Sequence, residues 1–239
     1  MSGSLSVRKG EQNMRRSEIN RAIRGAEELL AAYRISLPEY ASWSAEDWKA
    51  REAETALIRK LMLGWDITDY GCGDFDRIGT VLYTLRNGSG TEPDTGVPYC
   101  EKYLLLQEGQ RLPKHYHVSK TEDIINRAGG LLQVFLWNAD PETGRQLDTD
   151  VTVYRDGIRH VYRPGEEILV TPGNSISLTP YMAHIFGAKE GYGPLICGEV
   201  SKVNDDLTDN FFLEPTARFP EIEEDEPVLH PMCNEYGSL

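Results

Sequence analysis

Two histidines and a glutamate stand close together near the middle of the chain. His115 and His117 are two residues apart, and Glu122 follows five residues after the second histidine. Residues two apart on a β-strand face the same side, so both imidazoles point one way, and a turn can then bring the carboxylate beside them. Two imidazoles and a carboxylate suit a divalent first-row metal such as Mn, Fe, Co, Ni or Zn. The spacing therefore predicts a metal site.

A fourth metal ligand is expected from a later strand. His184, within residues 179–186, is the best-placed candidate. Four protein ligands in an octahedral shell would leave two open positions, where the ion can act as a Lewis acid on a bound oxygen. His160 and His230 have no comparable neighbours, and we expect them to be ordinary histidines.

Apolar residues at three-to-four spacing predict two helices before the metal motif. The first is expected over residues 17–35 with Ser17 as its N-cap. The second is expected from Ser44 to about Gly64, with Asp47 completing a variant of the capping box. Both helices are amphipathic, so they must pack on another part of the fold.

Strand signals dominate the chain from residue 66 onward. Short β-rich runs alternate with Gly, Pro, Asn and Asp turns at roughly ten-residue intervals. This rhythm is typical of an all-β sandwich or barrel, and not of βαβ units. The runs are 80–85, 103–106, 131–137, 151–154, 168–170 and 175–178.

These patterns divide the chain into four stretches that form one compact domain. Residues 1–13 are small and polar, and we expect them to be a remnant foreign to the natural chain, which then starts at Met14. The N-terminal helices are expected over residues 14–65 and the barrel over 66–203. Residues 204–239 are rich in Pro and acids and are expected to form a C-terminal arm or lid. Their acidic run, 221–226, is expected to be a solvated face.

The composition argues against two classes of partner. The 239 residues include 38 acids and 25 bases, for a formal net charge of −13. This charge disfavours binding to a nucleic-acid backbone, which needs a basic face. No stretch approaches the ~20 apolar residues of a membrane helix. The four cysteines lack CxxC spacing and are typical of inert thiols in a reducing compartment, so a cytoplasmic location is expected.

The metal motif resembles the first motif of the cupin superfamily, Gly-x5-His-x-His-x4-Glu-x6-Gly, at every fixed position. The second cupin motif is looser here, because residues 165–184 carry its turn residues and a histidine without the usual spacing. From Met14 onward the chain also resembles the bacterial D-lyxose isomerase family. This resemblance implies a cupin-type β-barrel, or jelly roll, with an N-terminal helical layer. The blocks that carry it are 16–23, 73–79, 114–124 and 214–220.

The resemblance also implies an activity. It implies a metal-dependent aldose–ketose isomerase that interconverts D-lyxose and D-xylulose, with D-mannose and D-fructose as further substrates. Mn(II) is the implied metal, and a homodimer is the implied assembly. The sugar would place its C1 carbonyl and C2 hydroxyl at the open metal positions, where the ion stabilises an enediolate. A free sugar is expected, because no Gly-rich phosphate cradle accompanies the motif.

An aldose–ketose interconversion also needs a base that moves a proton between C2 and C1. Lys120 is close to the metal ligands along the chain, and a nearby cation favours its neutral form, so it is a candidate for proton transfer or for holding a sugar hydroxyl. Glu214 is the candidate base, folded over the barrel mouth. Arg218 is the candidate to orient Glu214 or to bind the sugar.

Two other functions fit the same ligands. Three histidines and a glutamate can hold Fe(II) in a cupin dioxygenase, and a cupin can also bind a sugar without turning it over. Four aromatic residues are candidates for the pocket wall, although such strand positions commonly belong to the core. They are Trp137, Tyr154, Phe186 and Phe212.

Overall fold

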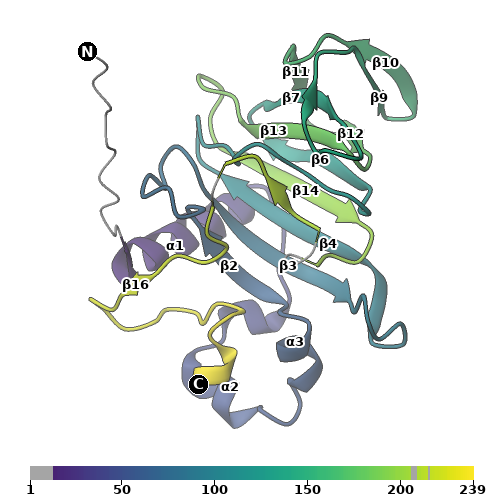
Figure 1. The fold of residues 1–239 in the computed structure, drawn as a ribbon. Coiled ribbons are helices and arrows are strands. Elements are labelled where there is room, and N and C mark those ends of the chain that lie inside the picture. The colour runs from purple at the N-terminus through teal and green to yellow at the C-terminus, as the bar shows by residue number, and fades with distance from the viewer. Residues whose placement is uncertain (1–12, 206–208, 215) are drawn as a thin grey trace, which may run out of the picture.

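The computed structural model describes residues 13–205, 209–214 and 216–239. Most of its strands form two sheets that share an apolar core, and helices cover one outer side (Figure 1). The mainly β fold with an N-terminal helical layer is therefore confirmed. The expected remnant at residues 1–13 lies, apart from Asn13, outside the described residues.

The larger sheet has eight strands, and every neighbouring pair in it is antiparallel. In spatial order they are β10 (Ile158–Tyr162), β9 (Val151–Arg155), β12 (Ser175–Leu178), β6 (Glu122–Gly129), β14 (Leu195–Ser201), β4 (Gly96–Leu106), β3 (Thr80–Gly88) and β2 (Gly64–Thr68).

The smaller sheet faces the first. Its strands, in spatial order, are β11 (Glu167–Val170), β7 (Leu132–Ala139), β13 (Met182–Ala188), β5 (His115–Tyr116) and β15 (Phe211–Phe212), and β8 (Gln146–Leu147) pairs with β7. All six strand runs expected from the sequence lie in strands of the two sheets, so these predictions are confirmed.

The main core lies between the sheets. Buried and less buried residues alternate along β6 and along β7 as far as Trp137, as expected of strands that pack one face into a core. Ile124 and Leu104 enter the core from the larger sheet, and Leu136 and Phe186 enter it from the smaller one. Residues on these inner faces carry the functional side chains.

The helical layer covers the outer face of β2, β3 and β4. Helix α1 (Arg16–Ala32) buries Ile19, Ile23 and Leu30 in a second core that includes Trp65 and Tyr83. The shorter helices α2 (Ala45–Ala50) and α3 (Ala56–Lys60), with the 3-10 turns η1 (Glu39–Ser42) and η2 (Tyr236–Ser238), complete this side. No helix within the described part of the chain is long and apolar enough to span a membrane.

The second expected helix is wrong in its length. The Ser44–Asp47 capping box is present, but the helix ends at Ala50, and turns at 51–55 separate it from α3. The Thr55 hydroxyl donates to the carbonyl of Arg51 at 3.0 Å, and this side-chain bond competes with a continuous helix.

The expected N-cap of the first helix is also wrong. Helix α1 starts at Arg16, with Arg15 as its N-cap, and the backbone N–H and hydroxyl of Ser17 donate to Asp225 at 2.8 and 2.7 Å. The Arg16 side chain is fully buried and is held by Glu224 and Glu235. Part of the acidic run thus binds α1, while four of its six residues are exposed, as expected for a solvated face.

The C-terminal residues return to the helical layer. Strand β16 (Ile222–Glu223) pairs in parallel with β1 (Met14–Arg15) beside α1, and the chain ends near α2 (Figure 1). There Trp48 stacks on Tyr236, with ring centroids 4.2 Å apart. The division into helices, barrel and C-terminal arm at residues 65 and 203 stays a prediction.

Candidate metal centre

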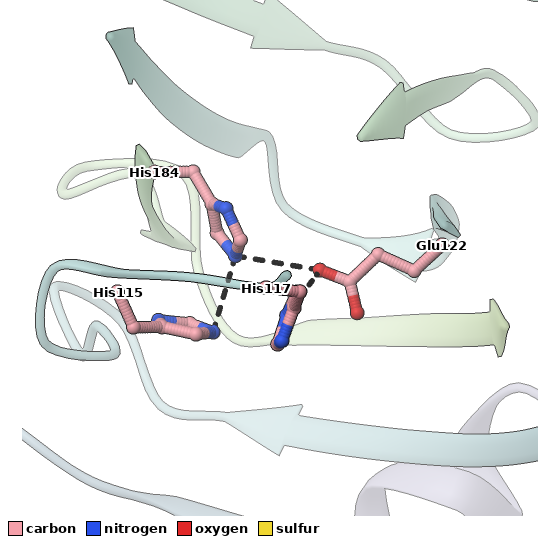
Figure 2. Close-up of side chains that lie close together, drawn as sticks. All are labelled: His115, His117, Glu122 and His184. Carbon is pink, nitrogen blue, oxygen red and sulfur yellow. Dashed lines mark hydrogen bonds and ion pairs between the residues drawn. The ribbon is translucent and has the colours of Figure 1, made fainter. Parts of the chain in front are cut away.

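The four expected metal ligands meet between the two sheets. His115 on β5 lies directly opposite His184 on β13, and Glu122 at the start of β6 faces them from the other sheet. His117 follows β5 immediately. The side chains point toward one another (Figure 2), and their ligand atoms all lie within 4.8 Å of each other. All four residues are buried.

The histidine rings are oriented by backbone carbonyls. The Nδ1 atoms of His115, His117 and His184 lie 2.9, 2.8 and 2.9 Å from the carbonyls of Pro113, Asp209 and Met182, respectively. A carbonyl can only accept, so each Nδ1–H donates, and each Nε2 keeps its lone pair.

These lone pairs converge on one point. The Nε2 atoms of His184 and His115 are 3.1 Å apart, and Glu122 Oε1 lies 3.3 Å from His184 Nε2 and 3.2 Å from His117 Nε2. Lone pairs and a carboxylate at such distances repel one another unless a cation lies among them. The donor set therefore fits a divalent metal.

Electrostatics keep the cluster in its ligating protonation state. Burial lowers the pKa of His184 to about 4, and burial together with the neighbouring imidazoles lowers the pKa of His115 well below its usual value. Burial alone would raise the pKa of Glu122, but Lys120 and His117 outweigh it and hold that pKa well below its usual value. His115 and His184 are thus neutral and Glu122 is ionised at neutral pH.

Lys120 lies beside the cluster and joins it to a second carboxylate. Its Nζ is 2.9 Å from Glu122 Oε2 and 3.1 Å from Glu199 Oε1. Burial disfavours the charged lysine, but Glu122 and Glu199 overcome this effect and raise its pKa. Two carboxylates stabilise the ammonium here, and the neutral form expected beside a bound cation stays a prediction.

Glu199 and Lys102 are site residues that the sequence reasoning missed. They lie opposite each other on β14 and β4, both are buried, and Lys102 Nζ is 3.6 Å from Glu199 Oε1. Their one signal in the sequence is a charge within an otherwise apolar strand, such as Glu199 after residues 195–198. A charge at a buried strand position needs a partner and often marks a functional site.

A small cavity of about 50 Å³ adjoins the cluster. It has room for one or two water molecules, at about 30 Å³ each in liquid water, and not for a sugar. Its wall includes Lys120, Glu199, Lys102, Asn210, Phe212 and Arg218.

The predicted substrate-binding residues differ in their relation to this cavity. Arg218 lines it and donates to Asp66 Oδ2 at 2.6 Å. Glu214 is exposed and does not line the cavity, and its charge acts on Lys114 and Cys72. Its role as a base stays a prediction.

Two of the four predicted aromatic residues line the cavity. They are Phe186 and Phe212, whose rings lie 6.0 Å from His184 and 5.2 Å from His115. Trp137 instead lies under the Lys114 ammonium, and Tyr154 is about half exposed on β9. A larger hollow of about 870 Å³ lies apart from the cluster, between α1 and residues 69–76.

The two other histidines have ordinary surroundings. His160 stacks on Tyr162, and His230 lies 3.3 Å from Glu27 at the helical layer. Neither belongs to a metal-ligating group within the described residues.

Comparisons with known proteins agree with this arrangement. The sequence profile of the D-lyxose isomerase family matches residues 14–236. The D-lyxose/D-mannose isomerase of Escherichia coli O157:H7 is 42% identical over 226 residues, and that of Serratia proteamaculans is 42% identical over 224. Each match covers 93% of this chain and 98% of the relative.

Solved structures share the fold at lower identity. The L-ribose isomerase of Acinetobacter sp. DL28, in complex with L-ribose, has a TM-score of 0.59 at 15% identity, covering 89% of this chain and 99% of that one. The L-ribose isomerase of Cellulomonas parahominis without ligand has a TM-score of 0.56 at 17% identity, covering 90% and 100%.

The two sheets around a buried histidine–glutamate cluster, taken with these relatives, define a cupin-fold sugar isomerase, an enzyme that interconverts aldoses and ketoses. More particularly, the chain belongs to the D-lyxose isomerase family.

Proposed function

We propose that this enzyme is a metal-dependent isomerase that converts D-lyxose to D-xylulose and D-mannose to D-fructose. One observation carries the proposal: three Nε2 lone pairs and the Glu122 carboxylate converge beside a buried Lys120–Glu199 pair. The relatives at 42% identity are named for both aldoses, which supports the choice of substrates.

His115, His117, Glu122 and His184 would hold the metal, for which we propose Mn(II). When bound, the divalent cation supplies Lewis-acid polarisation of the sugar's carbonyl and hydroxyl oxygens. The metal's identity rests on the family resemblance, because affinity order alone favours copper or zinc at such a site.

We assign the role of base to Glu199 because of its position in the cavity. Its carboxylate lies inside the cavity, where it would take the proton from C2 of the aldose and return it to C1. Lys120, as a charged donor, would hold a sugar oxygen next to the metal. Arg218 would bind hydroxyls at the far end of the sugar.

Glu214, the base expected from the sequence, remains the alternative. Its side chain is exposed and does not line the cavity, so it would reach C2 only after residues 209–214 moved. We further propose a homodimer in the cytoplasm, on the family resemblance and the cysteine pattern. Sedimentation velocity tests the dimer directly.

A single closed-cell experiment separates the candidate functions. Mn(II)-loaded protein is incubated with D-lyxose while ketose and dissolved oxygen are both followed, and Fe(II)-loaded protein is the parallel sample. We expect ketose without oxygen uptake. Oxygen uptake linked to sugar loss would indicate the dioxygenase. Sugar binding without either change would indicate a non-catalytic cupin.

A further inference from the structure

Residues 209–214 bind the stretch of chain that carries two of the metal ligands. We call residues 209–214 the covering segment. Its strand β15 pairs with β5, where Phe212 lies opposite His115 and Phe211 opposite Tyr116. The Leu213 N–H donates to the Lys114 carbonyl at 3.1 Å. The segment therefore forms one wall of the cavity.

Asp209 is the first residue of the covering segment. It makes four contacts with residues 117–120, which follow β5. Its Oδ1 accepts the N–H groups of Val118 and Ser119 at 2.9 and 2.8 Å, and its Oδ2 accepts the N–H of Lys120 at 2.8 Å. Its backbone carbonyl accepts Nδ1–H of His117 at 2.8 Å. Asp209 is itself buried.

These contacts divide into two tasks. The carboxylate closes the loop between His117 and Glu122, because three consecutive N–H groups converge on it. The carbonyl fixes the ring of His117 with Nε2 toward the cluster. The other two histidines donate the equivalent hydrogen bond to residues two positions away, Pro113 and Met182. His117 donates it to a residue 92 positions away.

The long separation makes the orientation of His117 depend on the covering segment. If the segment leaves the cavity wall, the carbonyl of Asp209 leaves the His117 ring. A sugar is larger than the present cavity of about 50 Å³, so substrate entry requires some part of the wall to move.

We propose that Asp209 is a positioning residue that couples the covering segment to the metal site. Its carboxylate anchors the segment on residues 118–120, and this anchor places the carbonyl that orients His117. Because coupling between two equilibria is reciprocal, metal binding stabilises the closed segment to the same extent that the closed segment strengthens metal binding. The inference rests on the proposed metal centre.

The test compares Asp209→Ala with a matched control, Asp140→Ala. Asp140 also accepts consecutive backbone N–H groups, those of Glu142 and Thr143 at 3.1 and 2.8 Å, but it does so in an exposed turn and does not line the cavity. Mn(II) affinity is measured by competition with a chelating indicator. Chymotrypsin cleavage after Phe211, Phe212 or Leu213 is measured with and without Mn(II).

We expect Asp209→Ala to lose about tenfold or more in Mn(II) affinity, the usual effect of removing support from a ligating histidine. Mn(II) should slow cleavage of the covering segment in the wild type and have much less effect in this variant. Asp140→Ala should keep wild-type affinity and protection. If Asp209→Ala does not fold, Asp209→Asn replaces it. The asparagine amide N–H groups would then face the Lys120 N–H, donor against donor, and a several-fold loss of Mn(II) affinity is expected.

Unchanged Mn(II) affinity and unchanged protection in the Asp209 variant, with a wild type that binds Mn(II), would overturn this inference alone. An equal loss in Asp140→Ala would also overturn it, because the effect would then be general destabilisation. A wild-type protein that binds no divalent metal would overturn the proposed centre and this inference together.

Discussion

His115 and His184 lie directly opposite each other on neighbouring strands, with their Nε2 atoms 3.1 Å apart and both Nδ1–H groups bound to carbonyls. At this distance in a buried site the two lone pairs repel each other, and a cation bound between them would remove the repulsion. Strand register sets this distance, so the backbone fold prepares the centre before any metal binds.

Replacing one histidine of this pair should weaken metal binding strongly. We expect His184→Ala to lower Mn(II) affinity by at least about a hundredfold, since loss of only the hydrogen-bond partner of a ligating histidine costs about 10- to 100-fold. His160→Ala is the control, because His160 stacks on Tyr162 and belongs to no metal-ligating group among the described residues. Calorimetric titration with Mn(II) measures both. Tight binding by His184→Ala would show that the cluster is not the centre.

The choice of base is tested by two isosteric variants. Glu199→Gln should reduce kcat by about 10²- to 10⁴-fold, the usual share of a general base, while Mn(II) affinity stays near that of the wild type. Glu214→Gln should retain most of the turnover, because its side chain is exposed. Steady-state kinetics on D-lyxose measure both variants. The opposite ranking would assign the base to Glu214 and leave Glu199 a structural partner of Lys120.

Removing the ammonium between the two carboxylates should destabilise the metal-free protein. Lys120→Met leaves Glu122 and Glu199 buried without this cation, at a cost of about 3–5 kcal/mol. The partly exposed pair of Lys189 and Glu167 provides the control, and Lys189→Met should cost at most about 1 kcal/mol. Urea denaturation in a chelator measures both. Equal effects would mean that the buried pair contributes no more than a surface one.

The metal-free protein should lose stability as the pH falls from about 6.5 to about 4. The unfolded histidine takes up a proton below its ordinary pKa of 6.5, whereas buried His184 does so only near 4, so the unfolded state binds more protons in this window. His184 alone contributes up to about 3 kcal/mol at about 1.4 kcal/mol per pH unit. The depressed pKa of His115 acts in the same direction.

The variant His184→Leu isolates this contribution. Because the chain carries a net charge of −13, acid also relieves the general repulsion between its negative charges. Only the difference in the free energy of unfolding between the wild type and His184→Leu therefore reports on the histidine. Urea denaturation in a chelator at pH 7, 6 and 5 gives that difference. A stability gap that stays constant over the range would contradict the low pKa of His184.

The ligands could be predicted from the sequence because their signal is local. Alternation along a strand places His115 and His117 on one side, and the glycines at 109 and 129 mark the turns around them. His184 could be placed only through a family motif with irregular spacing. Its pairing with His115 depends on strand register across 69 residues.

The rest of the site arises from contacts distant in sequence. Glu199 and Lys102 reach the cavity only because β14 lies between β4 and β6, and Asp209 reaches His117 only because the covering segment pairs with β5. The burial of Arg16 has a similar origin, because it depends on the C-terminal partner Glu235, which local periodicity does not reveal.

The most direct test is metal-dependent ketose formation from D-lyxose by wild-type protein and by His184→Ala, each first stripped with a chelator. The account predicts no xylulose from either stripped protein, recovery of turnover when Mn(II) is added to the wild type, and no recovery in the variant. Equal turnover by the wild type before and after Mn(II) is added would contradict the account. Binding of one Mn(II) per chain without any xylulose would also contradict it.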